Sequence, residues 1–258
     1  IDGPDTDNAI FYKTNSFTFL GNNPIATSLR DISEFILIEN SSGDTLRIYS
    51  VHLKASSGTT NEQQRLAEVT LLRNVTDALP LNSNFIVCGD FNIYGSNEPA
   101  YVKLKEQTTQ GYFIDIYNLT GTWNNSAYAP YHTQSPRVRQ FGGGATGGMD
   151  DRFDMILMSQ AVIDSGRIMY VNNSYTAYGN DGLHFNDSIN RPQNNAVGQT
   201  IADALHYSSD HLPVFASFKF ESIIPVEIEP FTATVIDNDV IIKWTTVTET
   251  NNLGFDIE

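Results

Sequence analysis

A short apolar run that ends in Gly-Asp-Phe-Asn constrains the fold of this chain more than any other feature. The run is Phe-Ile-Val-Cys at 85–88, and Gly-Asp-Phe-Asn follows it at 89–92. A run this short and this apolar predicts a buried strand, because it leaves no room for a helical period. The glycine then turns the chain and places Asp90 and Asn92 at the mouth of the strand, where functional groups often lie. The alternative is an ordinary Gly-Asp turn after a core strand.

The chain around this run predicts a strand–helix–strand unit over residues 46–92. An alternating strand leads into His52, and Thr59–Glu62 has the spacing of a capping box. Apolar residues then recur on one helical face until Pro80 stops the helix. In a right-handed crossover the carboxyl ends of both strands lie at one edge of the sheet. His52 and Asp90 are therefore expected at the same edge.

Further strands are predicted on both sides of this unit. Residues 9–20 predict two short strands around a polar turn, and Glu34–Ile38 predicts another. Arg152–Met158 is an apolar strand with one internal charge, Asp154, which needs a partner there. Val214–Phe220 is the last strand of this part of the chain. Alternation of strands and a helix places the chain in the α/β class.

Two polar stretches predict loops. Residues 142–148 are rich in glycine but lack the Lys-Ser/Thr ending of a P-loop, so a nucleotide cradle is rejected. Residues 171–206 predict a long surface excursion. Arg137 and Arg139 could contact a substrate, and a solvated loop is the alternative reading of both. Three isolated histidines are interpreted as loop residues: His132, His184 and His206.

Charge and length limit the possible functions. The chain has 258 residues, enough for one large domain or for one domain and the start of another. Its net charge of -15 argues against nonspecific polyanion binding by a broad basic face. An enzyme that meets phosphate in a local site is still allowed. The single cysteine, Cys88, lies in the apolar run and is expected to fill the core. No apolar run approaches membrane-spanning length, so no stable membrane insertion is expected, and we expect a monomer.

The composition changes after Phe220. We expect one domain over 1–222, and a linker with the start of a second domain over 223–258. A β-hairpin is predicted between Phe231 and Thr245. Trp-Thr-Thr at 244–246, Glu-Thr-Asn-Asn at 249–252 and Gly-Phe at 254–255 resemble the opening of fibronectin-like β-sandwich modules in secreted proteins of Bacteroidota-type bacteria. That resemblance implies a secreted or cell-surface bacterial protein. The alternative is an extra hairpin of the main domain.

Four motifs in order carry a second resemblance. They are His-Leu-Lys from His52, Gly-Asp-Phe-Asn from Gly89, Asp154 within its strand, and Ser-Asp-His at 209–211. Together they resemble the endonuclease/exonuclease/phosphatase superfamily over residues 1–220. The resemblance implies a four-layer α/β/β/α sandwich of the DNase I-like type, with two mixed sheets face to face and helices outside. It implies an enzyme that hydrolyses phosphoric esters.

The resemblance and the chemistry of the residues together suggest catalytic roles. His211 is the best general base, because the unperturbed histidine pKa lies near neutrality. Asp154 would orient it. Asp90 would orient the attacking water or protonate the leaving group, and Asn92 would donate to the phosphoryl group. His52 would stabilise a phosphoryl oxygen or the leaving group.

Binding roles follow from the same resemblance. Asp210 would bind a metal ion together with Asp90. Mg²⁺ is the natural ion, with Mn²⁺ possible, because it accepts one or two carboxylates and keeps water and substrate oxygens. Arg30 matches a position where deoxyribonuclease-like members carry a phosphate-contacting arginine. Thr146 and Asn92 are further candidates for contact with the substrate phosphate.

One departure from the family pattern bears on activity. The family has a metal-binding glutamate, and usually an asparagine, upstream of the first residue of this chain. No matching side chain precedes Arg30, and Glu34 and Glu39 lie in the wrong place. Both ends of the chain look cut. Residues 1–258 alone are therefore expected to be inactive, to bind Mg²⁺ weakly, and to leave a strand near 9–20 or 34–38 with an unpaired edge.

The reading favoured by the sequence is a secreted, Mg²⁺-dependent phosphodiesterase, most simply a nuclease that acts on DNA or RNA. A sphingomyelinase-like or inositol-phosphate phosphoesterase is the first alternative. A catalytically dead surface-binding module is the second. Residues 121–150 and 171–206 are polar and show no apolar membrane-binding hairpin, which favours the nuclease over the sphingomyelinase.

Overall fold

The chain divides into two compact units, Ile1–Phe220 and Glu221–Glu258. The computed structural model describes residues 8–164, 167–221, 231–237 and 239–246. The division falls two residues before the boundary expected at residue 222. No helix in the described ranges is long and apolar enough to cross a membrane.

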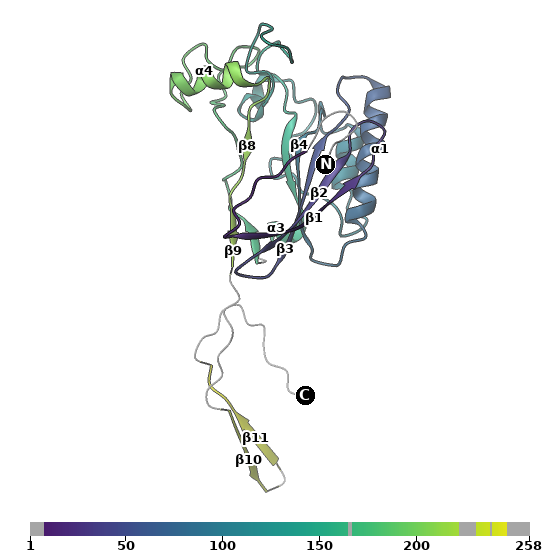
Figure 1. Ribbon diagram of the computed structural model, residues 1–258, viewed down its shortest axis with the longest axis vertical. Helices are drawn as coiled ribbons and strands as arrows, with labels where there is room; N and C mark the ends of the chain where they lie inside the picture. The colour runs from purple at the N-terminus through teal and green to yellow at the C-terminus, as the bar shows by residue number, and fades with distance from the viewer. Residues whose placement is uncertain (1–7, 165–166, 222–230, 238, 247–258) are drawn as a thin grey trace. The chain divides into compact units, whose positions relative to one another are not determined.

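The first unit is built on a five-stranded sheet with the strand order β1-β2-β3-β4-β5 (Figure 1). Its strands are β1 (Phe17–Ile25), β2 (Ile32–Glu39), β3 (Thr45–His52), β4 (Asn84–Asp90) and β5 (Asp154–Met158). β3 and β4 are parallel, and all other neighbours are antiparallel. Helix α1 (Thr59–Thr76) connects the parallel pair. The predicted strand–helix–strand unit is confirmed.

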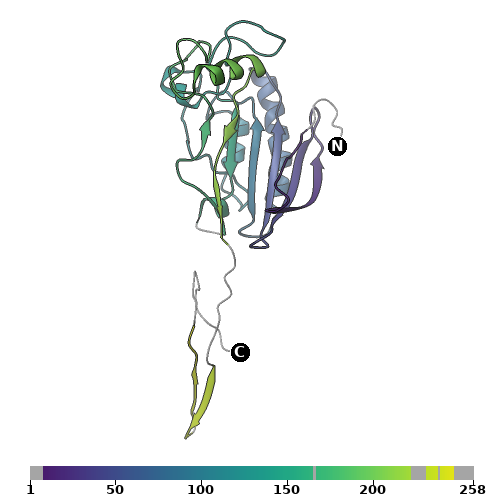
Figure 2. The ribbon, with the colours of Figure 1, turned by 60° about the vertical axis from the view of Figure 1, so that its left-hand side comes forward.

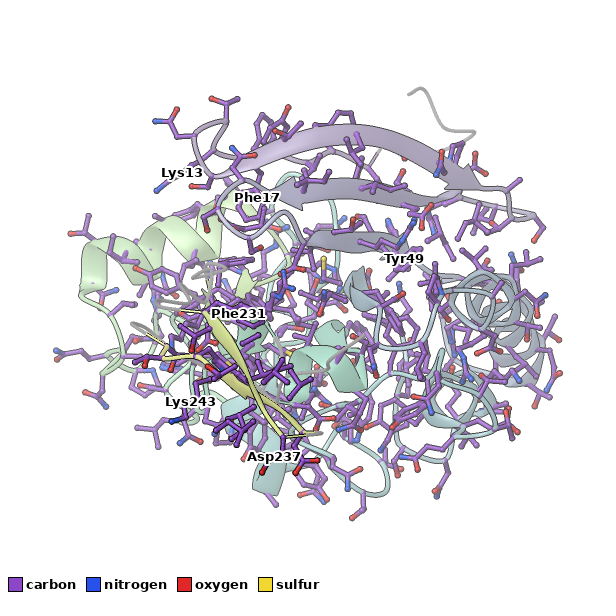
Figure 3. The ribbon with its side chains drawn as sticks, turned by 90° about the horizontal axis from the view of Figure 1, so that it is seen from below. Lys13, Phe17, Tyr49, Phe231, Asp237 and Lys243 are labelled. Atoms are coloured by element: carbon purple, nitrogen blue, oxygen red, sulfur yellow. The ribbon has the colours of Figure 1, made fainter. Side chains whose placement is uncertain are left out.

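Two helices, α1 and α2 (Pro99–Lys105), pack against each other and, with the loops around them, cover one face of this sheet. Val69 and Leu72 of α1 are fully buried against Tyr49 of β3 and Val87 of β4. Figure 3 labels Tyr49 on the sheet and Phe17 at the start of β1. Each fully buried side chain of this size stabilises the fold by about 1.5–3 kcal/mol.

The capping box expected at Thr59 is wrong, because the N-cap of α1 is Gly58 and no side chain caps the helix. The reason lies in the chain before it. The buried guanidinium of Arg65 donates to the carbonyls of Lys54 and Ser56, at 2.7 and 2.8 Å. These bonds hold the segment that enters the helix, and the helix starts one residue earlier than expected. Thr59 is then its first residue.

Four short strands lie on the other face of the sheet. β6 (Ile168–Tyr170) pairs with β9 (Phe218–Phe220), and β7 (Thr176–Ala177) pairs with β8 (Val214–Phe215). Their side chains pack on Ile86, Ile156 and Met158 of the large sheet, in a cluster that includes Cys88. Two short strand pairs therefore face the large sheet in the first unit, and α1 and α2 lie on its opposite face. The predicted DNase I-like α/β sandwich class is confirmed.

Three segment predictions differ from the structure. Only the second strand expected in 9–20 forms, as β1, and residues 8–13 lie outside the strands. β1 lies at an edge of the sheet, so of the two places expected for an unpaired edge it is the one near residues 9–20 that the structure supports. β2 is paired on both sides, so the alternative at Glu34–Ile38 is wrong. The strand expected over Val214–Phe220 is interrupted, because Ser217 bonds to Ser174 and Val171 of a neighbouring turn.

The polar stretch 171–206 holds more structure than expected. Besides β7, it contains most of α4 (Gln199–Ser208). Ala202 and Leu205 of α4 are buried, and Leu205 packs in one cluster with Ile189 and Met149. The first unit also contains α3 (Gln160–Ile163) and a 3₁₀ helix over Ser126–Tyr131.

The second unit contains the predicted hairpin. β10 (Thr232–Ile236) pairs with β11 (Asp239–Lys243) in antiparallel register. Figure 3 labels Phe231 and Lys243 at the open end of the hairpin and Asp237 at its turn. Residues 249–255, which carry much of the resemblance to a fibronectin-like module, lie outside the described residues. That module is therefore not confirmed.

Candidate active site

Strand register brings three of the predicted side chains into one row at an edge of the large sheet. His52 of β3 pairs with Asp90 of β4, and Asp90 pairs with Asp154 of β5. His52 Nε2 lies 3.5 Å from Asp90 Oδ2. The crossover argument from the sequence predicted the first pair. Asp154 joins the row because β5 runs antiparallel to β4, so its first residue meets the last residue of β4.

His211 completes the row from the segment that leads into β8. Its Nδ1 donates to Asp154 Oδ2 at 2.7 Å. Its Nε2 lies 3.8 Å from Asp90 Oδ2. The structure thus brings together His52, Asp90, Asp154 and His211, and it gives Asp154 the hydrogen-bonded partner that its place in an apolar strand requires. The catalytic roles of these residues stay predictions.

The Gly-Asp-Phe-Asn sequence has a geometric reason. Gly89 has φ 136°, and a Cβ there would lie 2.0 Å from the Val51 carbonyl oxygen. Only glycine therefore lets β3 and β4 approach at the site. Asn92 has φ 51°, its backbone N–H donates to Asp90 Oδ1 at 2.9 Å, and its Nδ2 donates to the Leu53 carbonyl at 3.2 Å. Asn92 holds the Asp90 carboxylate in place.

Two residues that the sequence analysis did not select also shape the site. Thr133 Oγ1 accepts from the backbone N–H groups of Phe153 and Asp154, at 3.1 and 3.0 Å, and so fixes the start of β5. Gln134 Nε2 lies 2.6 Å from His211 Nε2. Both belong to a segment without periodicity, and no local signal marks them. Only the folded chain brings them to the site.

Burial and neighbouring charges change the acidity of two site groups. Burial raises the pKa of Asp90 to about 6; the Asp154 charge adds to this rise and His211 opposes it. Burial lowers the pKa of His211, but the hydrogen bond and charge of Asp154, with Asp90 and Asp210, outweigh it and raise the pKa to about 9. At neutral pH the His211 ring is therefore cationic, and it must lose a proton before it can act as a base.

Arg30 and Thr146, which are predicted to contact the substrate phosphate, lie in different surroundings. Arg30 Nη1 donates to the carbonyls of His52 and Leu53, at 3.4 and 3.3 Å, so it lies against the backbone at the site edge. Thr146 is exposed in the glycine-rich loop. Contact of either side chain with substrate phosphate stays a prediction.

The residues expected to bind a metal ion do not form a metal site. Asp210 Oδ2 accepts from the Ala145 N–H at 2.6 Å, and Oδ1 lies 3.8 Å from Arg137 Nη2. A Cβ at Gly144 would lie 2.6 Å from the Asp210 carboxyl carbon, so the loop closes tightly over this side chain. No group of three or more His, Cys, Asp or Glu in the described part of the chain could hold a metal ion. We therefore derive no step through one.

Glu34 does not supply the missing carboxylate. It is buried in β2, and it accepts from Arg47, Tyr49 and Asn23 at 2.7, 2.8 and 2.8 Å. These bonds lower its pKa against the effect of burial. Its role is to satisfy the charge of Arg47 within the sheet.

Comparisons with known proteins support the fold. No protein-family model and no curated protein sequence matches the chain. Among solved structures, the chain is similar to TDP2 of D. rerio complexed with a single-strand DNA product, with 16% identity over 80% of this chain and 69% of that chain and a TM-score of 0.50. The first unit has the endonuclease/exonuclease/phosphatase fold.

Two further structures with the endonuclease/exonuclease/phosphatase fold are similar to the chain. One is the human Nocturnin catalytic domain with bound sulfate, with 21% identity over 81% of this chain and a TM-score of 0.49. The chain spans 62% of that domain. The other is a mannosyl-6-phosphatase of Bacteroides thetaiotaomicron, with 16% identity over 81% of this chain and 69% of that chain and a TM-score of 0.43.

Proposed function

We propose that the protein hydrolyses phosphodiester bonds of a nucleic acid. The observation that carries the proposal is the hydrogen-bonded pair of His211 and Asp154, set beside Asp90 and His52 at one sheet edge. The D. rerio TDP2 structure, which contains a single-strand DNA product, supports the choice of substrate. A secreted or cell-surface bacterial location is part of the proposal and rests on the resemblance of the chain after Phe220.

The hydrolysis needs a base, an orienting group and a proton for the leaving oxygen. The neutral His211 ring takes a proton from water at Nε2 while the water oxygen bonds to phosphorus. Asp154 stabilises the resulting cation through Nδ1–H. The bond from phosphorus to the leaving oxygen breaks, and that oxygen receives a proton from the site. Asp90, with a pKa of about 6, can hold this proton near neutrality, and otherwise it orients the water.

His52 and Asn92 stabilise charge in this scheme. His52 lies next to Asp90 in the row and can donate to a phosphoryl oxygen or to the leaving group. Asn92 has a second amide N–H besides the one that bonds to Leu53. A requirement for Mg²⁺ or Mn²⁺ is a separate proposal. It rests on the order of the four motifs, and the described residues do not build a site for the ion.

The substrate class can be tested with a panel. The complete gene product is incubated with single-stranded DNA, RNA, plasmid DNA, sphingomyelin and inositol phosphates, with and without Mg²⁺. Cleavage of the nucleic acids and not of the lipid or the inositol phosphates is expected. Turnover of sphingomyelin or inositol phosphates alone would replace the nuclease with a phosphoesterase of the other class. No turnover of any substrate would leave a binding module.

A further inference from the structure

A second recess lies beside the candidate active site. Residues of α4 and of the segments 136–139 and 187–191 line a pocket of about 380 Å³. That size is within the range of about 300–1,000 Å³ found for small-molecule sites. Figure 2 shows α4 at the end of the sheet toward which β4 points, which is the end that carries Asp90. We call this recess the flanking pocket. Its lining includes Arg139, Asn190, Arg191, His206 and Tyr207.

The flanking pocket is basic, although the protein is acidic. The chain has only 15 Lys and Arg against 30 Asp and Glu. Two of those arginines, Arg139 and Arg191, line this pocket, both are exposed, and neither forms an ion pair with another residue that the structure describes. The acidic groups that face them are Asp187 and, on α4, Asp203. Asp187 accepts from the Ser188 N–H, and Asp203 accepts from Asn190 and Gln199. Asp203 also interacts electrostatically with Arg191. The lining itself holds two arginines against one carboxylate, so it can hold a phosphate.

Asn190 forms part of the wall of the pocket. Its side chain is more than nine-tenths buried, and its Nδ2 donates to Asp203 Oδ1 at 2.8 Å. That bond to a carboxylate fixes the orientation of the amide, since a flipped amide would set two acceptors against each other. The Oδ1 atom then has no partner in the protein and is itself buried from solvent.

Exposed aromatic rings lie at the pocket. Tyr207 is 55% exposed, and its ring packs edge-on against that of Phe141, itself 51% exposed, at a centroid distance of 5.1 Å. Exposed rings beside arginines are the combination that binds single-stranded nucleic acid, because bases stack on the rings while the cations hold the phosphates. In a duplex the bases are stacked and paired, so they cannot enter such a pocket.

The flanking pocket is connected to the candidate active site at two points. His206 Nδ1 lies 3.1 Å from the Pro136 carbonyl, and Pro136 follows by two residues the Gln134 that contacts His211. Four extended residues, from 134 to 138, span at most about 14 Å. Helix α4 also ends at Ser208, three residues before His211. One nucleic-acid strand can therefore reach both places.

We propose that the flanking pocket binds a nucleotide of a single-stranded nucleic acid next to the bond that is cleaved. Arg139 and Arg191 bind the phosphate, and the ring of Tyr207 stacks on the base. The proposal rests on the proposed nuclease function and narrows its substrate to single strands. None of these residues belongs to the row at His211.

Binding of a fluorescein-labelled single-stranded DNA hexamer, followed by anisotropy in the complete gene product, tests the pocket. We expect Arg139→Ala with Arg191→Ala, and separately Tyr207→Ala, each to weaken binding about tenfold or more. The double arginine variant should also lower the slope of log affinity against log salt by about 1.4. Arg167→Ala is the matched control, because Arg167 is exposed and pairs with Asp44 beside β3 at the end opposite His52.

Three results would each overturn the proposal. The first is that the variants bind the hexamer like wild type, and the second is an equal loss in Arg167→Ala. The third is a duplex of the same sequence that binds as tightly as the single strand. The exposed side chains replaced here leave the fold intact, and thermal unfolding checks this. Hydrolysis of bis(p-nitrophenyl) phosphate, which is too small to reach the pocket, tests the proposed function separately. If wild type binds the hexamer but hydrolyses no diester, the proposed hydrolysis is refuted and the proposed binding in the flanking pocket still stands.

Discussion

At His211, the two ring nitrogens have different neighbours, and this difference sets the charge of the site. Nδ1 donates to Asp154, whereas Nε2 faces Gln134 and Asp90. A cationic ring, which the raised pKa of His211 favours at neutral pH, donates from both nitrogens, so the Gln134 amide oxygen, not its nitrogen, should face Nε2 in that state. A substrate water must displace this amide before His211 can act on it.

The titration of His211 can be measured directly. In a carbon-13 and proton NMR titration we expect its ring to change charge at a pH of about 9, since Asp154 raises its pKa. Asp154→Asn should bring the pKa down toward about 6.5. A pKa raised above the unfolded value stabilises the fold below about pH 6.5, and that contribution is lost as the pH rises through about 9. A wild-type ring that titrates at or below 6.5 would contradict the contact with Asp154.

Base catalysis by His211 also predicts the direction of a pH profile. Only the neutral ring can accept a proton from water, so hydrolysis should increase as the pH rises toward about 9. If Asp90 also protonates the leaving oxygen, the loss of its proton above about pH 6 offsets the gain of neutral His211, and the rate should be level between about pH 6 and 9. A profile of kcat/KM that falls steadily from pH 6 to 9 would therefore assign the essential proton to Asp90 and contradict the base role.

At the scale of elements, the parallel pair β3–β4 depends on one glycine. Gly89→Ala would place a Cβ 2.0 Å from the Val51 carbonyl oxygen at φ 136°. We expect a loss of at least about 3 kcal/mol in the free energy of unfolding. Gly43→Ala is the control, because Gly43 has φ 72° but nothing within 4 Å of an added Cβ. It should cost about 1 kcal/mol. Equal urea-unfolding curves for the two variants would refute the close approach of the strands.

The sequence predicts elements well where local pattern and pairing rules agree. Apolar runs mark β4 and β5, and the crossover rule then places His52 beside Asp90. Prediction from the sequence fails where hydrogen bonds between residues far apart in the chain determine the structure. Thr133 and Gln134 reach the site through backbone bonds to Asp151 and Leu212, which no periodicity encodes. The sequence does not predict helix α4, because the helix has few buried residues and the polar sequence around them predicts a loop.

At the scale of the whole molecule, the described residues leave the second sheet in two short pairs and the metal ligands incomplete. Asp90 and Asp210 already bond within the protein, and Mg²⁺ gives up its water ligands reluctantly. We expect a calorimetric titration of residues 1–258 with MgCl₂ to show no saturable binding below the order of millimolar. Micromolar binding would show that residues other than Asp90 and Asp210 bind the ion.

Turnover of a single-stranded DNA oligonucleotide by the complete gene product tests the central claim most directly. His211→Ala should lower kcat by about 10²–10⁴-fold, because a positioned base contributes that much. Asp154→Asn should act in the same direction, and Arg167→Ala should match wild type. Circular dichroism of each variant shows that the fold is retained. Near wild-type kcat in folded His211→Ala would contradict the claim that this histidine carries out the hydrolysis.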